Sequence, residues 1–115
     1  MAFVALEKLH KLCDGYRQRV RLAGAEWLLL QEEGKLYCIA NQCPHMGAPL
    51  HTASLSYSLE NPGHGAGISY PRLRCAMHGM EFDLRSGKPV NTAGCVASLR
   101  FLPLVYEANQ VGVDI

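Results

Sequence analysis

Two short motifs that each pair a cysteine with a histidine constrain this chain more than any other feature of its sequence. The first is Cys43-x-His45 and the second is Cys75-x-x-His78, with 29 residues between His45 and Cys75. Thiolates and imidazoles are common protein ligands of zinc and of iron. The two motifs therefore predict one metal site with four ligands, and a scaffold that brings two loops face to face.

The pairing within each motif bears on the kind of metal. In one type of [2Fe–2S] cluster, two thiolates hold one iron and two neutral imidazoles hold the other. Each loop must then supply one ligand to each iron, which a cysteine and a histidine on the same tight turn can do. Zinc also accepts two cysteines and two histidines, but its ligands more often pair as Cys with Cys and His with His. The mixed pairs therefore favour a cluster over zinc.

The residues next to the ligands suit a bulky cofactor. Pro44 and Pro49 restrict the first loop, while Gly47 and Gly79 let the backbone pass close to a cluster. With these neighbours the chain closely resembles the Rieske ferredoxins. The segments that carry the resemblance are residues 43–50, 75–79 and 82–89.

The resemblance implies an all-β, Rieske-like fold of antiparallel sheets with two cluster-binding loops. It implies a single domain over residues 1–115, in which approximately residues 41–90 hold the cluster and the remainder forms a basal β part. It also implies one [2Fe–2S] cluster of the Rieske type. Its buried iron would be bound by Cys43 and Cys75, and its outer iron by His45 and His78.

The same resemblance implies a one-electron carrier and not an enzyme. Such a carrier passes electrons from a ferredoxin reductase to a terminal oxygenase or a similar redox enzyme. Nothing else in the 115 residues offers a nucleophile with its base, which agrees with a carrier. Two alternatives stay open: a small Rieske-like subunit of an assimilatory nitrite reductase, and a zinc-stabilised interaction module.

The neighbours of the ligands also predict a low reduction potential. Cytochrome-complex Rieske proteins carry an extra cysteine in each motif, and these positions correspond here to Ala48 and Met77, so the loops cannot share a disulfide. Those proteins also place two hydroxyls near the cluster, where this chain has Met80 and Phe82. Hydrogen bonds to cluster sulfurs raise the potential. We therefore expect a midpoint below about +100 mV, within a Rieske span of roughly −150 to +300 mV.

Composition excludes some classes of partner. The chain has 11 Lys and Arg against 10 Asp and Glu, and its net charge of +1 gives no reason to expect nucleic acid or an anionic membrane. Its apolar runs are too short to span a bilayer, and the first residues lack the basic and apolar regions of a signal peptide. These features predict a cytoplasmic protein. The remaining cysteines, Cys13, Cys38 and Cys95, are expected to be packed in the interior.

Alternating apolar residues and turn signals predict short antiparallel strands. The expected strands are residues 3–6, 17–22, 26–31, 35–40, 72–74, 81–84, 99–106 and 111–115. The polar segment from about 51 to 70 is interpreted as an insertion whose centre, residues 61–67, is neither a helix nor a central strand. It either shapes a docking face or is a tolerated surface insertion. Met46, Pro49 and Met80 are expected to form an exposed apolar rim around the two histidines.

Overall fold

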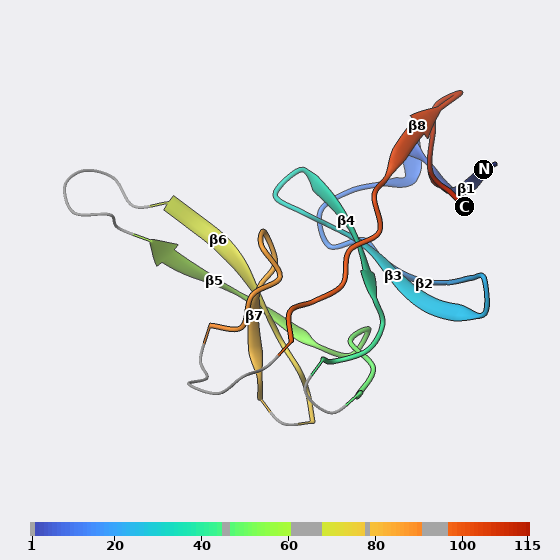
Figure 1. The fold of residues 1–115 in the computed structure, drawn as a ribbon. Coiled ribbons are helices and arrows are strands. Elements are labelled where there is room, and N and C mark those ends of the chain that lie inside the picture. Colours follow the sequence, from blue (N-terminus) through green and yellow to red (C-terminus); the bar gives the residue numbers. More distant parts are fainter. Residues whose placement is uncertain (1, 45–46, 61–67, 78, 91–96) are drawn as a thin grey trace. The chain divides into compact units, whose positions relative to one another are not determined.

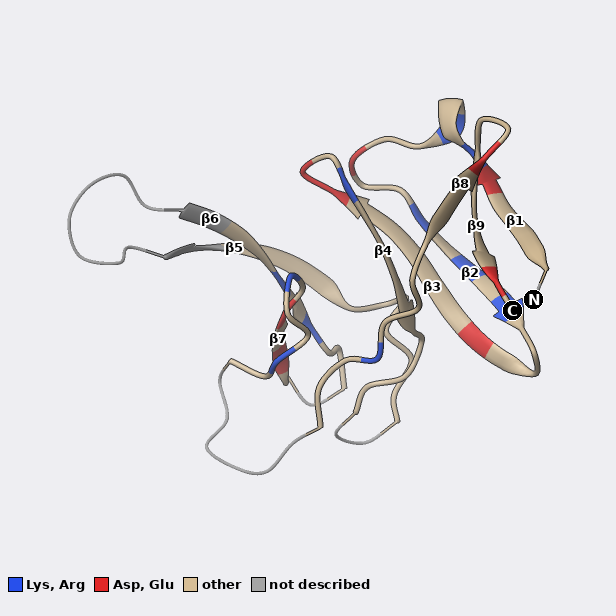
Figure 2. Cartoon of the chain, turned by 45° about the horizontal axis from the view of Figure 1, so that its top comes forward, with Lys and Arg blue, Asp and Glu red and all other residues tan. Residues whose placement is uncertain are grey.

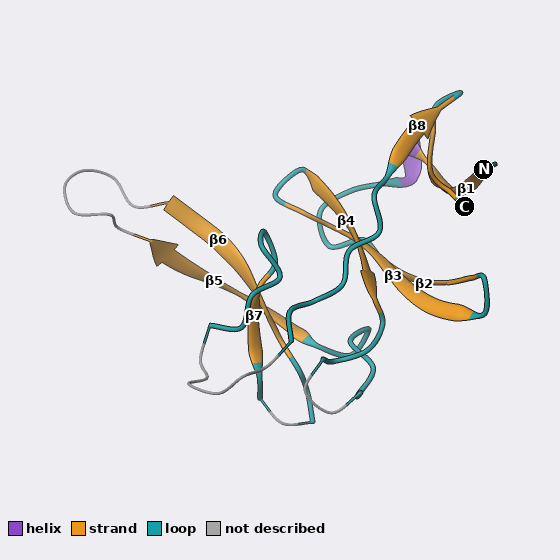
Figure 3. Cartoon of the chain, in the orientation of Figure 1, coloured by secondary structure: helices purple, strands orange, loops and turns teal. Residues whose placement is uncertain are grey.

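The structure is a computed structural model that describes residues 2–44, 47–60, 68–77, 79–90 and 97–115 (Figure 1). In these residues the chain forms strands joined by turns, with one short 3-10 helix, η1, at Leu9–Lys11 (Figure 3). The expected all-β class is therefore confirmed. The strands are β1 (Phe3–Lys8), β2 (Arg17–Leu22), β3 (Ala25–Glu32), β4 (Lys35–Ala40), β5 (Ser54–Glu60), β6 (Ile68–Arg74), β7 (Glu81–Asp83), β8 (Val105–Glu107) and β9 (Gln110–Asp114).

The chain divides into two compact units. We call Met1–Asn41 together with Arg100–Ile115 the terminal unit, and Gln42–Leu99 the loop unit. Basic and acidic residues are interspersed over the strands of both units in Figure 2. The expected cluster-binding part, residues 41–90, stays a prediction because only the cluster can define it.

The terminal unit holds two antiparallel sheets, with strand orders β1-β9-β8 and β2-β3-β4. Three of its hairpins turn on two residues that both have positive φ: Ala23–Gly24, Glu33–Gly34 and Ala108–Asn109. Such turns twist in the same sense as the strands they join, which explains why glycine and asparagine mark them in the sequence. Leu29, Cys38 and Val111 are buried at the centre of this unit.

The last predicted hairpin is only partly correct. The sequence predicts a strand over residues 99–106, whereas β8 begins at Val105. The preceding residues instead follow the edge of β4, where the Ala40 N–H donates to the Arg100 carbonyl at 2.9 Å and the Leu102 N–H donates to the Cys38 carbonyl at 2.8 Å. Their hydrogen bonds are therefore made with β4, and the edge of that strand is covered.

The loop unit holds a third antiparallel sheet, with strand order β5-β6-β7. Most of it was not predicted, because only residues 72–74 were expected to be extended before the second motif. In the structure β5 and β6 pair from Ser54↔Arg74 to Glu60↔Ile68. Serine alternates with leucine and tyrosine along β5, so the strand has the period of two but the composition of a loop. Pro71 lies within β6, and its carbonyl accepts a hydrogen bond from the Leu84 N–H at 3.0 Å.

The predicted centre of the insertion, residues 61–67, lies outside the described residues. Within the described part of the chain no helix is long and apolar enough to cross a membrane.

Candidate metal centre

Both predicted cysteine ligands lie in the loop unit, each at the start of a tight loop. Cys43 begins the first loop, residues 43–48, and Cys75 begins the second loop, residues 75–80, directly after β6. The two loops lie at the same end of the loop unit in both views of the fold (Figures 1 and 2). His45 and His78 lie outside the described residues, so their part in the site stays a prediction.

The first loop is closed by two backbone hydrogen bonds to its cysteine. The Cys43 N–H donates to the Ala48 carbonyl at 2.7 Å, and the Gly47 N–H donates to the Cys43 carbonyl at 2.7 Å. Gly47 has a φ of +77°, in the left-handed region that a side chain would strain. This glycine lets the chain reverse direction within six residues.

The second loop repeats this pattern. The Cys75 N–H donates to the Met80 carbonyl at 2.8 Å, the Gly79 N–H donates to the Cys75 carbonyl at 2.9 Å, and Gly79 has a φ of +68°. In both loops the cysteine at position i is therefore bonded to residues i+4 and i+5. In the sequence the predicted histidine stands at i+2 of one motif and at i+3 of the other, although the two loops share these hydrogen bonds.

The residue before each cysteine lies against the glycine of the same loop. A Cβ built on Gly47 would lie 3.3 Å from Nε2 of Gln42, and one built on Gly79 would lie 3.2 Å from Nη2 of Arg74. The two loops thus carry equivalent side chains at position i−1. One of these side chains is a neutral amide and the other is a guanidinium.

The two thiols are sheltered from solvent. Cys43 and Cys75 are each 1% exposed, and Leu50, Leu73, Phe82 and Leu84 are fully buried in the same unit. Met77, in the middle of the second loop, is 69% exposed. Two buried thiols at matching positions of two like loops suit an iron that takes two thiolates. The described residues therefore fit the sulfur side of the predicted cluster.

A hollow of about 490 Å³ borders the second loop. It is lined by Ser54, Arg74, Cys75, Ala76, Met77 and Gly79. Arg74 and Cys75 thus border the same space, which lies within the loop unit. Among the described residues no group of three or more His, Cys, Asp or Glu gathers as a metal site. Two of the four predicted ligands, His45 and His78, lie outside the described residues.

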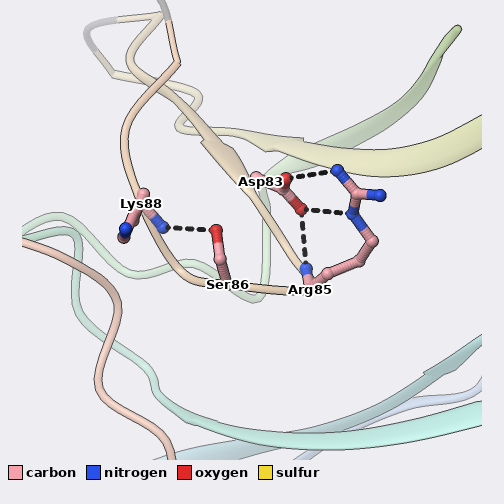
Figure 4. A network of polar contacts seen from close by, with 4 residues as sticks. All are labelled: Asp83, Arg85, Ser86 and Lys88. Carbon is pink, nitrogen blue, oxygen red and sulfur yellow. Dashed lines mark hydrogen bonds and ion pairs between the residues drawn. The ribbon is translucent and has the colours of Figure 1, made fainter. Parts of the chain in front are cut away.

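A charged turn follows the second loop and β7 (Figure 4). The Asp83 carboxylate accepts hydrogen bonds from the Arg85 N–H at 2.9 Å and from Nε and Nη2 of its guanidinium at 3.1 and 2.8 Å. These bonds hold the pKa of Asp83 below its usual range, against the opposing effect of burial. The Arg85 guanidinium also lies 4.1 Å from the ring centre of Tyr70 on β6. The Arg85 side chain therefore connects the turn after β7 to the neighbouring strand β6.

The predicted apolar rim around the two histidines stays a prediction, because His45 and His78 lie outside the described residues. Pro49 is exposed and Met80 is half-buried, whereas Met46 lies outside the described residues. In the sequence analysis, Met77 is only the residue that stands where other Rieske proteins have a disulfide cysteine, and it is not part of the predicted rim. Met77 nevertheless has the most exposed large apolar side chain among the described residues. Its place between Cys75 and His78 was the signal that could have identified it.

The other cysteines and histidines differ in their surroundings. Cys38 is buried, as predicted, and burial raises the pKa of its thiol to about 11. Cys13 is exposed, so the prediction that it is packed in the interior was wrong. It lies in the turn before β2, where Asp14 and Gly15 keep the chain at the surface. His51 is half-buried, and Cys95 and His64 lie outside the described residues.

Comparison with known proteins identifies the family. The family model of the Rieske [2Fe–2S] domain matches residues 2–103 of this chain, so the chain belongs to that family. Its cofactor is accordingly a Rieske-type [2Fe–2S] cluster. Apoptosis-inducing factor 3 of mouse and of human is 30% identical over 100 residues, which is 87% of this chain. This chain covers only 14% of the length of those two relatives.

Solved structures share the fold over nearly the whole chain. The ferredoxin of carbazole 1,9a-dioxygenase from Nocardioides aromaticivorans IC177 has a TM-score of 0.70 and 22% identity, covering 98% of this chain and 97% of that one. A protein from Mycobacterium tuberculosis described as an NADH-dependent nitrite reductase small subunit has a TM-score of 0.71 and 16% identity, with coverages of 97% and 93%. At these identities the likeness establishes the Rieske ferredoxin fold.

Proposed function

We propose that Cys43 and Cys75 bind one iron of the cluster and that His45 and His78 bind the other. The observation that carries this proposal is the pair of matching loops, in which a buried thiol begins the same hydrogen-bonded turn twice. When bound, the cluster accepts and releases one electron. The loops hold the thiols in place by backbone hydrogen bonds, and the burial of both thiols limits the access of water.

The protein then acts as a one-electron carrier and not itself as an enzyme. It takes electrons from a ferredoxin reductase and passes them to a terminal oxygenase or a similar redox enzyme. The similarity in fold to the ferredoxin of a carbazole dioxygenase supports this role. On this proposal the loop unit is the cluster-binding part and the terminal unit is the basal part of a single domain.

A second candidate is the small subunit of a nitrite reductase. The observation in its favour is the equally close fit to a structure described as such a subunit. The two candidates differ in how the chain meets its partner, because a carrier dissociates between two enzymes and a subunit stays bound to one.

Two measurements test the proposed function. A spectroelectrochemical titration of the purified protein should show a reversible one-electron couple below about +100 mV. If the protein is a carrier, native purification from the source cells should yield the chain alone. Electron transfer to a terminal oxygenase of the dioxygenase type should then depend on addition of the purified chain. Stoichiometric co-purification with a larger protein that reduces nitrite would instead establish the subunit. The absence of any reversible couple would rule out both roles.

A further inference from the structure

Arg74 stands out among the charged residues near the second loop. It immediately precedes Cys75, it is exposed, and its guanidinium lies against Gly79, four residues beyond that cysteine. Arg74 and Cys75 also line the same hollow. The arginine cation therefore lies beside the loop that begins at a predicted ligand, and it lines the same hollow as that residue.

The charge of Arg74 is not neutralised within the described residues. Its register partners are Ser54 on β5, which is neutral, and Glu81 on β7. The Glu81 carboxylate is engaged by Arg72, at 3.1 Å from Nη2. Arg74 itself makes no hydrogen bond or ion pair with any described residue. Two arginines and one glutamate therefore leave one net positive charge at this end of the sheet.

The first loop has no such charge, because Gln42 occupies the equivalent position against Gly47. Since a glutamine side chain is accommodated there, the turn itself does not require a cation at position i−1. The guanidinium before the second loop is thus an electrostatic difference between two loops whose described residues share the same backbone hydrogen bonds.

From this we propose that Arg74 sets the reduction potential of the cluster, raising it above the value that the loops alone would give. This inference rests on the proposed function. With two ferric irons, two sulfides, two thiolates and neutral imidazoles the oxidised cluster has no net charge, and one added electron makes it an anion. A nearby cation stabilises the reduced form and leaves the neutral oxidised form almost unaffected. Arg74 therefore favours electron uptake, and partly offsets the loss of the hydroxyl donors at the positions of Met80 and Phe82.

The direct test is the midpoint potential of Arg74→Gln, a change that gives the second loop the side chain of the first. We expect the equilibrium constant for reduction to fall about threefold, a shift of about −28 mV for a one-electron couple. Arg74→Lys should stay near the wild-type value because it keeps the charge. The reciprocal change, Gln42→Arg, should shift the midpoint upward.

Salt distinguishes a charge effect from a structural one. Arg74 is exposed, so its effect should shrink when the ionic strength rises from about 10 mM to about 1 M, over which the Debye length falls from about 30 to 3 Å. An unchanged midpoint in Arg74→Gln would overturn the inference, as would equal shifts in Arg74→Gln and Arg74→Lys. The visible spectrum of each variant separates these outcomes from failure of the proposed function. A cluster with an unchanged potential contradicts only the role of Arg74, whereas the absence of a cluster from the wild-type protein contradicts both.

Discussion

The first and second loops share one pattern of backbone hydrogen bonds in their described residues and have different surroundings. Each begins at a buried cysteine whose N–H donates a hydrogen bond to the carbonyl of position i+5, and each has a glycine of positive φ at position i+4. They share little sequence between these positions, and the predicted histidine occupies a different place in each. The shared hydrogen bonds therefore fix the position of the cysteine in each loop, whereas the sequence between cysteine and glycine differs and carries the predicted histidine.

The loops also differ in the segments that come directly after them. After the first loop the chain makes a turn in which the Ala53 N–H donates to the Leu50 carbonyl at 3.0 Å. After the second loop it enters β7 and the turn braced by Asp83 and Arg85. Together with Gln42 and Arg74, these features put more charge around the second loop than around the first.

The largest effect expected is the loss of the cluster when either Cys43 or Cys75 is replaced, which tests whether the two cysteines are equivalent. Cys43→Ser and Cys75→Ser should each abolish the cluster, seen as loss of the visible absorption and of bound iron, because a serine oxygen is a poor substitute for a thiolate. Cys13→Ser is the matched control and should keep the full cluster, since Cys13 is exposed and lies in the terminal unit. Retention of a normal cluster by either loop variant would break the equivalence.

The next largest effect concerns folding stability, and it tests the role of the Asp83–Arg85 pair in the segment after the second loop. Asp83→Asn should lower the free energy of unfolding at pH 7 by about 1–2 kcal/mol, because it weakens hydrogen bonds between a carboxylate and Arg85. The folded-state pKa of Asp83 is lowered, so its contribution is present above the unfolded value of about 3.9. That contribution is lost as the pH falls through the lowered folded pKa.

Denaturant unfolding at a series of pH values provides the measurement. The difference between wild type and Asp83→Asn should be constant near neutrality and should close in acid. Asp14→Asn, in the terminal unit, is a useful comparison because Asp14 is exposed and accepts hydrogen bonds from Gln31 and from the Gly34 N–H. A difference for Asp83→Asn that grows in acid would contradict the assigned role.

The smallest effect tests whether the two glycines are alike. Gly47→Ala and Gly79→Ala should each cost about 1 kcal/mol of folding stability, because a side chain is strained at positive φ. Gly34→Ala isolates this strain, since Gly34 has a φ of +76° and open space around the position of a Cβ. The loss of folding stability in Gly47→Ala and Gly79→Ala should be only slightly larger than in Gly34→Ala. The reason is that the side chains of Gln42 and Arg74 can move away from the added Cβ. Unequal excesses would show that one side chain is fixed more firmly than the other.

Much of this fold could be predicted because the signals are local. Gly24, Gly34 and Asn109 mark turns that demand positive φ, and the flanking residues alternate with a period of two. The β5–β6 hairpin could not be predicted, because serines along β5 have the composition of a loop and Pro71 argues against a strand. The shortening of β8 could not be predicted either, since it depends on the edge of β4, which is about 60 residues away in the sequence.

For the candidate metal centre, too, some features can be read from the sequence motifs, whereas others depend on the folded backbone and on side-chain conformation. The motifs identify Cys43 and Cys75 as candidate ligands, and the structure buries both thiols. The common turn is hidden in the sequence because the histidine spacings differ, and only backbone hydrogen bonds reveal it. The place of Arg74 against Gly79 depends on a side-chain conformation, which no pattern of residue types determines.

The most direct test of the central claim is the EPR spectrum and metal content of the purified, reduced protein. We expect a Rieske-type signal after reduction, with about two irons and two acid-labile sulfides per chain. One tetrahedral zinc per chain, with no visible absorption and no EPR signal after reduction, would contradict it.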